Sequence, residues 1–199
     1  MHRKAIRHLR ENDPTLASVI DRIGPCRLKP QTDLSHFESV ARAIVFQQLS
    51  GKAAGTIHGR FAGLFPAQRP TATHLLTLED DVLRTAGLSR PKVKYLRDLA
   101  SRVASNELPI DTLHELADDE VLGHLTRVKG VGIWTAQMFL LFRLGRPDVL
   151  PDLDLGIQKA VQLAYRLRKR PTPERVRKIG VKWAPFRSVA TWYLWRSID

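Results

Sequence analysis

The sequence predicts an all-α protein built from two packed helical subdomains. Apolar residues recur at helical spacing along most of the 199-residue chain, and hydrophobic residues make up 43% of it, which is enough for a substantial core. We find no convincing run of alternating apolar and polar residues that would indicate a strand. Two glycines one residue apart, Gly130 and Gly132, separate two of the apolar-periodic segments and predict a tight turn between two helices.

Helix signals follow one another along the chain. Asp13–Pro14 reads as an N-cap followed by proline at the first helical position, and Gly24 ends that helix. Helical spacing begins again at Phe37 and gives way to the loop Gln47–Gly51. Further helices are expected at residues 53–64, 81–86, 90–103, 118–128, 133–144, 153–167, 173–179 and 185–198. The clearest loops are Pro66–Thr73 and Arg146–Pro151, and the second could join two helical halves of a single 1–199 domain.

The charge of the chain favours a polyanionic partner. The formal net charge is +12, and such an excess of one sign is not needed for folding because like charges repel. One basic cluster comprises Arg166, Arg168, Lys169, Arg170, Arg175, Arg177, Lys178, Lys182 and Arg187. A second comprises Arg84, Arg90, Lys92, Lys94, Arg97 and Arg102. Although a single basic residue is most simply a solvated one, the ensemble predicts a nucleic-acid surface.

Other classes of protein fit the sequence less well. No apolar run is long enough to span a bilayer, and no apolar stretch follows the basic Met1–Arg10 as in a secretory signal. The single cysteine, Cys26, allows no intramolecular disulfide and no four-cysteine zinc or iron–sulfur site. We therefore expect a protein without a membrane partner and without an iron–sulfur cluster.

The Gly130–Val131–Gly132 turn can hold an anion on backbone amides. Glycine lets another backbone approach closely, and the amides that open the next helix, where Thr135 lies, favour a phosphate. Such a contact needs no side chain and is independent of base sequence. The alternative is an ordinary helix connection in which Gly130 is only a C-cap.

Several motifs together resemble the helix–hairpin–helix DNA glycosylase superfamily, and within it the alkylpurine (3-methyladenine) branch. The similar segments are Val128–Ala136 with Leu140–Phe142, Asp148–Leu155, Phe37–Ala54 and Lys182–Trp195. The resemblance covers roughly residues 30–199. It implies an active site in the cleft between the two subdomains, double-stranded DNA with alkylated bases as partner, and a monomer in the bacterial cytoplasm or in a nucleus.

The resemblance implies that Asp154 is the catalytic residue. Glycosidic cleavage passes through a transition state with positive charge on the sugar, which a nearby carboxylate stabilises. An N-terminal Asp is otherwise most often an N-cap. Many relatives carry an Asp–Asp pair here, and Leu153 replaces its first member, so Asp152 stays open as the alternative.

The resemblance assigns the base pocket to Trp134 and Trp195. Trp183 and Trp192 are expected in the core, with a contribution to the pocket as the alternative. Relatives that also cleave the DNA backbone carry a lysine where this chain has Trp134. We therefore expect a monofunctional enzyme that leaves an abasic site. A flipped cationic base would be held between flat, electron-rich rings.

The remaining expectations concern DNA contacts and ions. The DNA-contacting residues implied by the resemblance are Gln48, Leu49, Ser50, Gly130, Val131, Gly132, Thr135 and Arg187. Backbone carbonyls of Thr126, Val128 and Val131 would bind a structural Na⁺ or K⁺, and no other cofactor is required. Two rival functions remain: a glycosylase of the same fold for a deaminated or oxidised base, and a DNA-damage binding protein without catalytic activity.

Overall fold

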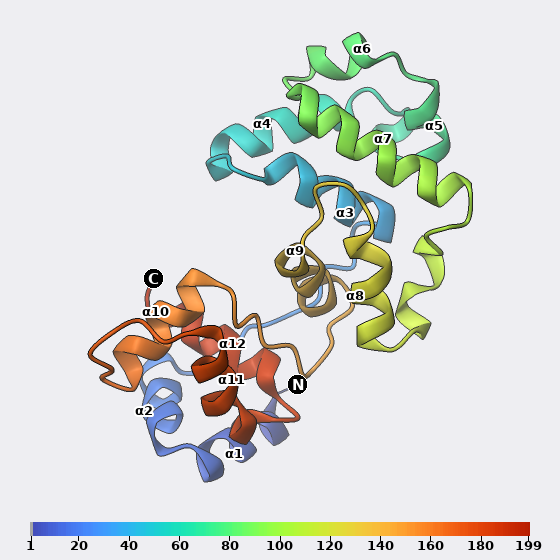
Figure 1. Cartoon of the computed structure of the whole chain (residues 1–199). Helices are drawn as coiled ribbons and strands as arrows, with labels where there is room; N and C mark the ends of the chain where they lie inside the picture. The colour runs from blue at the N-terminus through green and yellow to red at the C-terminus, as the bar shows by residue number, and fades with distance from the viewer. Residues whose placement is uncertain (1) are drawn as a thin grey trace. The chain divides into compact units, whose positions relative to one another are not determined.

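The computed structural model describes residues 2–199, and every regular element in that range is a helix (Figure 1). The all-α class predicted from the sequence is therefore confirmed. The chain divides into two compact units. Unit 1 comprises Met1–Pro30 and Leu140–Asp199, and unit 2 comprises Gln31–Phe139. No helix within residues 2–199 is long and apolar enough to cross a membrane.

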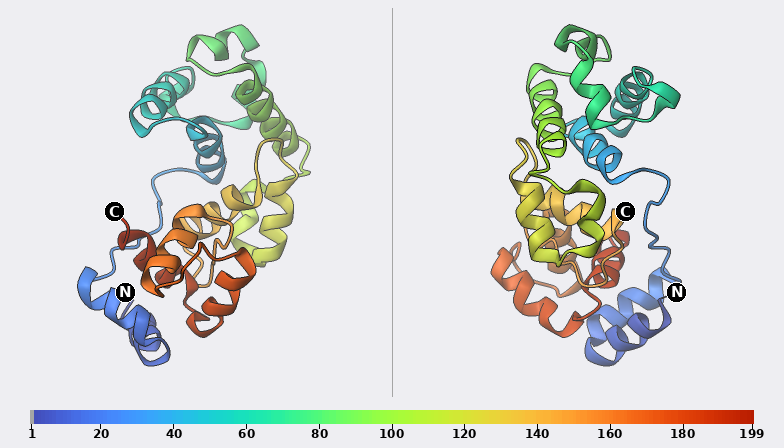
Figure 2. Two further views of the ribbon diagram at one scale, coloured as in Figure 1. Left: turned by 60° about the vertical axis from the view of Figure 1, so that its left-hand side comes forward. Right: turned by 90° about the vertical axis from the view of Figure 1, so that its right-hand side faces the viewer.

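Unit 1 is formed by the two ends of the chain. Its helices are α1 (Arg3–Asn12), α2 (Pro14–Ile23), α10 (Leu155–Ala164), α11 (Pro173–Gly180), the short 3-10 helix η4 (Val181–Trp183) and α12 (Arg187–Arg196). Helix α2 contacts α1, α10 and α12, so the N-terminal helices lie beside the C-terminal ones in both views of Figure 2. Leu16, Trp183 and Tyr193 are fully buried in the core that these helices share.

A buried carboxylate, Asp13, joins the two ends of the chain inside unit 1. It caps α2 by accepting the N–H groups of Thr15 and Leu16, as the sequence predicts. The same side chain accepts hydrogen bonds from the Trp183 indole, at 2.7 Å, and from the Tyr165 hydroxyl. Burial raises the pKa of Asp13, but these donors and Lys182 outweigh that effect and hold the pKa below its ordinary value.

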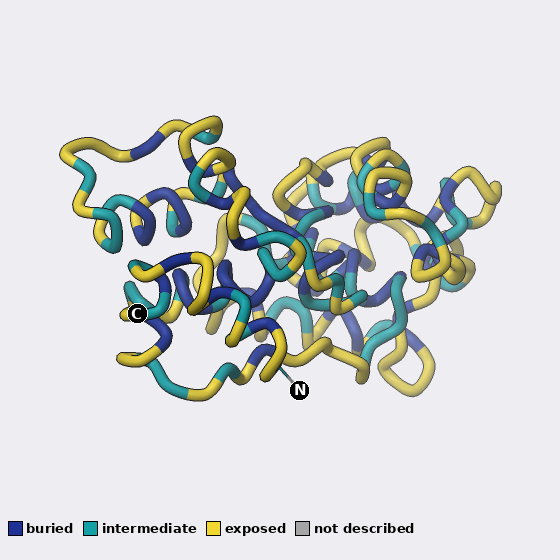
Figure 3. Tube along the Cα trace, turned by 90° about the horizontal axis from the view of Figure 1, so that it is seen from below, coloured by how far each residue is buried: buried dark blue, intermediate teal, exposed yellow. Residues whose placement is uncertain are grey.

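Unit 2 is one continuous stretch of chain. Its helices are α3 (His36–Phe46), α4 (Gly51–Ala62), η1 (Pro66–Gln68), α5 (Ala72–Thr77), α6 (Asp80–Thr85), α7 (Arg90–Ala104), η2 (Ile110–Glu115), α8 (Asp118–Thr126) and α9 (Ile133–Met138). Ser35 and Glu38 form a capping box that fixes the start of α3. Ile44, Phe61, Leu96 and Leu125 are fully buried. Figure 3 shows that buried and exposed stretches alternate along these helices, as expected for amphipathic elements.

The helices differ from the predicted ones in several places. The expected loop Pro66–Thr73 contains η1 and the first residues of α5, and neither α5 nor η2 was expected. Helix α1 was not expected because its segment is strongly basic and has few apolar residues; Ala5 and Leu9 supply its buried side. The predicted helix 133–144 ends as an α-helix at Met138 and continues as a π-helix, η3 (Phe139–Arg143). Helix α10 begins at Leu155 rather than at residue 153, because the side chain of Asp154 caps it.

Candidate active site and nucleic-acid interface

The turn between α8 and α9 adopts the conformation that its glycines predict. Gly130 has a φ of +78°, a backbone conformation that residues with a side chain rarely adopt. The ring of Tyr95, on α7, lies so close that a Cβ on Gly130 would stand 2.2 Å from its Cδ2 atom. Glycine is therefore required at position 130 for two reasons: the positive φ, and the Tyr95 ring that occupies the place of a Cβ atom.

Gly132 has a different environment from Gly130. Its φ of −89° suits any residue, and within residues 2–199 no atom lies within 4 Å of the position that its Cβ would take. Gly132 is the N-cap residue of α9, and no described side chain caps that helix. An anion can therefore approach the start of α9 closely, where the helix dipole favours negative charge.

The other hairpin residues can contact a ligand mainly through their backbones. The side chains of Val131 and Thr135 are buried. Asp98 on α7 stabilises the turn by accepting the backbone N–H of Lys129 at 2.9 Å. It also forms an ion pair with Arg102, with Nε–Oδ2 at 3.0 Å. Burial raises the pKa of Asp98, but these donors outweigh it and hold the pKa below its ordinary value.

The loop between α3 and α4 presents its side chains to solvent. Gln48, Leu49 and Ser50 are all exposed, and the apolar Leu49 side chain is 38% exposed. Gln48 adopts a φ of +56°, a strained conformation for a residue with a side chain. Ser50 also caps α4, so its hydroxyl already accepts the N–H of Ala53. The predicted DNA-inserting residues therefore lie at an exposed loop tip.

A concavity of about 750 Å³ lies in unit 2 between this loop and the hairpin. Its wall includes Gln48, Tyr95, Gly130, Trp134 and Thr135. Trp134 is 46% exposed, which is unusual for so large an apolar side chain. Four residues of this wall are among those that the sequence predicts to contact DNA or a base: Gln48, Gly130, Trp134 and Thr135.

Asp154 stands at the N-terminal end of α10 in unit 1, where it is half-buried. Its Oδ1 atom accepts the backbone N–H of Ile157 at 2.8 Å and the indole N–H of Trp195 at 3.1 Å. Gly156 allows this arrangement, because a Cβ there would stand 3.0 Å from the same Oδ1. Asp154 is therefore both the N-cap and an acid held in one orientation by two donors.

The structure brings Trp195 together with Asp154 and adds an aromatic neighbour, Phe142. The Phe142 and Trp195 rings stack with centroids 5.9 Å apart and planes 18° apart. Trp183 is fully buried, as expected, while Trp192 is half-buried and packs edge-on against Tyr193. Trp134 belongs to unit 2 and Trp195 to unit 1.

Asp152, the alternative acid, has a structural role. Its side chain is buried and forms an ion pair with Arg177 of α11. Its carbonyl oxygen accepts the side-chain amide of Gln158 at 3.0 Å. A buried carboxylate paired in this way is little exposed to a substrate, whereas Asp154 is half-exposed.

Part of the positive charge is engaged within the protein. Arg187 makes a two-pronged ion pair with Asp148, with Nε–Oδ1 at 2.7 Å and Nη2–Oδ2 at 2.8 Å. The hydrogen bonds that Arg187 donates to Asp148 raise the pKa of its guanidinium group. In the second basic cluster, Arg97 donates to the Leu75 carbonyl. The predicted DNA surface therefore has fewer available cations than the sequence suggests.

The predicted cation site stays a prediction. Thr126 is the last residue of α8, and the last carbonyls of a helix have no N–H partner within the helix. The Val128 carbonyl accepts the N–H of Val131 at 3.0 Å. These groups fit a weakly held monovalent ion. Among the described residues, no group of three or more His, Cys, Asp or Glu side chains could hold a metal.

The sequence did not reveal the supports of this site. Gln47 donates from Nε2 to the Gly130 carbonyl at 2.8 Å, and Tyr95 and Asp98 buttress the same turn from α7. Tyr95 and Asp98 lie three residues apart on α7, and this spacing could have indicated that they contact the same feature. An amphipathic helix, however, shows the same spacing when its residues only pack against a core.

Comparison with known proteins agrees with this arrangement. Residues 41–186 match the model of the HhH-GPD superfamily of base excision DNA repair proteins, and the chain belongs to that family. DNA-3-methyladenine glycosylase 1 of Schizosaccharomyces pombe is 34% identical over 95% of this chain and 83% of its own length. A putative DNA-3-methyladenine glycosylase of Bacillus subtilis, YfjP, is 31% identical over 84% of this chain and 60% of its own.

Solved structures give the same result for the fold. The S. pombe 3-methyladenine DNA glycosylase Mag1, in complex with abasic DNA, has a TM-score of 0.85 and 33% identity over 98% of this chain and 96% of that one. A DNA-3-methyladenine glycosidase from Bacillus halodurans has a TM-score of 0.89 and 34% identity over 97% of this chain and 88% of that one.

Proposed function

We propose that this protein is a monofunctional DNA glycosylase that hydrolyses the N-glycosidic bond of alkylated purines, of the 3-methyladenine and 7-methylguanine type. It extrudes the damaged nucleotide from the duplex, releases the base and leaves an abasic site. Its relatives named as 3-methyladenine DNA glycosylases, and the complex of Mag1 with abasic DNA, support this activity. The protein acts as a monomer on double-stranded DNA, in the bacterial cytoplasm or in a nucleus.

The chemistry of an alkylated purine makes one carboxylate sufficient. Methylation at N3 or N7 already gives the base a positive charge, so it leaves as a neutral molecule and no acid has to protonate it. What remains is positive charge on the sugar, which a carboxylate stabilises while it orients the attacking water. Removing an electrostatic contact of this kind costs roughly 3–4 kcal/mol of activation free energy.

The observation that carries the proposal is the setting of Asp154. Two donors, the N–H groups of Ile157 and Trp195, fix one of its oxygens at the head of α10, beside the Phe142–Trp195 stack. A fixed carboxylate reorganises little when charge develops next to it. Asp152 is the weaker candidate because its side chain is buried against Arg177, whereas Asp154 is half-exposed.

The hairpin would hold the DNA strand near the damaged nucleotide. The amides at the start of α9 and the open space at Gly132 suit a backbone phosphate, which needs close approach. Exposed Gln48 and Leu49 would fill the gap that the extruded nucleotide leaves. The net charge of +12 would supply the affinity that is independent of sequence.

Trp134 supports a purely hydrolytic reaction. A lysine at its position would offer an amine that forms a Schiff base with the sugar, whereas an indole cannot. The exposed Trp134 ring and the Trp195 ring would each offer a π surface to a cationic base, an interaction worth about 0.5–2 kcal/mol.

The decisive experiment is a base-release assay on duplexes that carry 3-methyladenine, 7-methylguanine, uracil or 8-oxoguanine. We expect release of the methylated purines; release of only uracil or 8-oxoguanine would overturn the substrate class. Binding to damaged duplexes without release of any base would favour the non-catalytic rival.

The role of the acid is tested by Asp154→Asn. We expect base release to fall by about two to three orders of magnitude while DNA affinity is largely kept. The matched control is Asp81→Asn, the same change at a side chain that is 92% exposed, which should keep full activity. Full activity of Asp154→Asn would remove Asp154 from the mechanism.

A further inference from the structure

Three residues on one side of α7 contact two separate segments, the end of α3 and the turn between α8 and α9. Lys92, Tyr95 and Asp98 are spaced three residues apart, which places them along one face of the helix. The ammonium group of Lys92 donates to the carbonyl of Val45 at 2.7 Å and to the carbonyl of Gln47 at 2.8 Å. These are among the last carbonyls of α3, which have no donor within their own helix.

The bonds continue from α3 to the hairpin. Gln47, whose carbonyl Lys92 holds, donates from its side chain to the Gly130 carbonyl at 2.8 Å. Tyr95 packs against Gly130, and Asp98 accepts the N–H of Lys129. The loop that begins after Gln47 and the phosphate-binding turn are therefore tied to each other and to one helix.

Lys92 is placed to cap α3, and it also lines the concavity of unit 2. The residue is half-buried, and burial lowers the pKa of its ammonium group. Two carbonyls engage two of its three N–H groups and hold the side chain against the end of α3. An ammonium at the C-terminus of α3 also interacts favourably with the helix dipole.

We propose that Lys92 is a positioning residue that fixes the inserting loop, Gln48–Ser50, at a set distance from the Gly130–Gly132 hairpin. The inference rests on the proposed function for its consequence on DNA. The hairpin would hold a phosphate while the loop fills the gap beside it, and both must fit the same strand at once. Without the cap, the end of α3 and the strained Gln48 would relax.

This role predicts a defect that depends on base pairing. Extruding a paired base costs several kcal/mol, and a correctly placed loop repays part of that cost. A base that already lacks a partner requires less help. A misplaced loop should therefore slow release of a paired lesion much more than release of an unpaired one, whereas general damage to the fold slows both equally.

The test compares Lys92→Met with the full-length wild-type protein. Single-turnover release of 7-methylguanine is measured opposite cytosine and opposite an abasic-site analogue. We expect the ratio of the unpaired rate to the paired rate to rise about tenfold or more in the variant, because two charge-assisted hydrogen bonds are lost. An unchanged ratio would overturn the proposal.

A second readout does not require catalysis. 2-Aminopurine placed beside a tetrahydrofuran residue in a duplex reports unstacking when the loop inserts. Wild-type protein should raise its fluorescence, and Lys92→Met should lose most of that rise at saturating protein. No rise with the wild type would refute loop insertion itself. If the wild type releases no methylated base, the proposed function fails, yet the fluorescence comparison still decides the role of Lys92.

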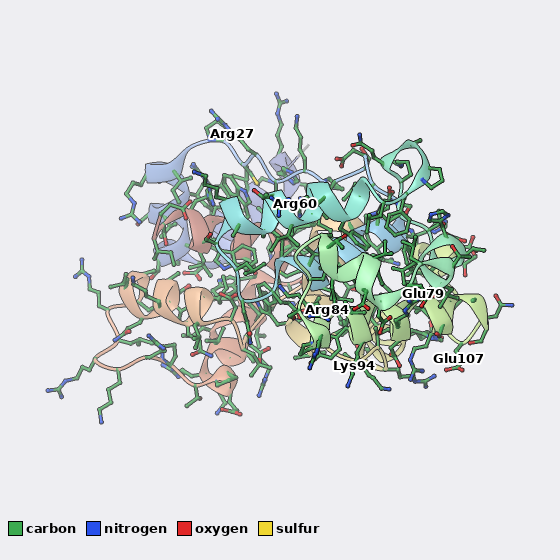
Figure 4. The ribbon with its side chains drawn as sticks, turned by 90° about the horizontal axis from the view of Figure 1, so that it is seen from above. Arg27, Arg60, Glu79, Arg84, Lys94 and Glu107 are labelled. Carbon is green, nitrogen blue, oxygen red and sulfur yellow. The ribbon has the colours of Figure 1, made fainter. Side chains whose placement is uncertain are left out.

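Two further variants complete the design. Lys94→Met makes the same substitution on the same helix at an exposed side chain, which Figure 4 labels. It removes one charge, so overall affinity falls slightly while the rate ratio and the fluorescence rise stay at wild-type values. Gln47→Leu leaves the Lys92 cap but breaks the bond to Gly130. It should reproduce the Lys92→Met pattern, and it tests the same link if Lys92→Met does not fold.

Discussion

Replacing the two hairpin glycines by alanine, one at a time, should separate stability from DNA binding. In Gly130→Ala, an L-residue is forced to φ +78°, which costs roughly 1–2 kcal/mol. The new Cβ would also stand 2.2 Å from Cδ2 of Tyr95, so the ring must move, at a cost of about 1–3 kcal/mol. We therefore expect the free energy of unfolding to fall by about 2–5 kcal/mol.

Gly132→Ala should weaken DNA binding and leave the free energy of unfolding nearly unchanged. At φ −89° and with no described atom within 4 Å, the added methyl group meets no obstacle. Stability should stay within about 1 kcal/mol of the wild type, with a slight gain because alanine restricts the unfolded chain. The methyl group would instead occupy the space that a DNA phosphate needs, so affinity for an abasic-analogue duplex should fall about tenfold.

Urea unfolding and a fluorescence-anisotropy titration, applied to both variants, measure the two effects independently. The reasoning predicts a crossed result, in which Gly130→Ala is unstable and Gly132→Ala is stable but binds poorly. Wild-type affinity in Gly132→Ala would refute close backbone approach as the mode of DNA binding. Wild-type stability in Gly130→Ala would refute the packing of Tyr95 against the turn.

Three other outcomes follow from the geometry. Asp13→Asn should lower the free energy of unfolding by about 3 kcal/mol at pH 7. Because the fold lowers the pKa of Asp13, its stabilising contribution is present above the unfolded pKa near 4 and is lost as the pH falls through the folded pKa. The urea midpoints of variant and wild type should therefore converge in acid. Asp148→Asn breaks the two-pronged pair with Arg187 at a partly exposed site and should cost about 1 kcal/mol by the same measurement. Because Trp134 cannot form a Schiff base, borohydride should trap no protein–DNA adduct, and strand breaks should appear only after alkali treatment.

The sequence predicted those parts of the site that are encoded locally. Helix periodicity, the Asp13 cap and the Gly130–Gly132 spacing each depend on residues a few positions apart, and all appear in the structure. The positive φ of Gly130 could be expected from the turn. The ring of Tyr95 beneath it could not, because 35 positions of chain separate the two residues and many helical residues would fit the same pattern.

The choice between two acids shows the same limit. Asp152 and Asp154 are the same residue type two positions apart, and either could begin a helix. Only the fold brings Arg177 to Asp152 and Trp195 to Asp154. Contacts across 25 and 41 positions decide which carboxylate is buried in an ion pair and which lies half-exposed beside Trp195, and no local pattern carries that information.

The division of the chain has a consequence for its biosynthesis. Unit 2 is continuous, so all of its residues leave the ribosome before the last 60, and it can fold while synthesis goes on. Unit 1 needs both ends of the polypeptide, and the buried Asp13 lacks two of its hydrogen-bond donors until Tyr165 and Trp183 have been made. Helices α1 and α2 precede the 41–186 family match and α12 follows it, so trimming the chain to that match would remove Trp195 and three of the helices that pack together in unit 1.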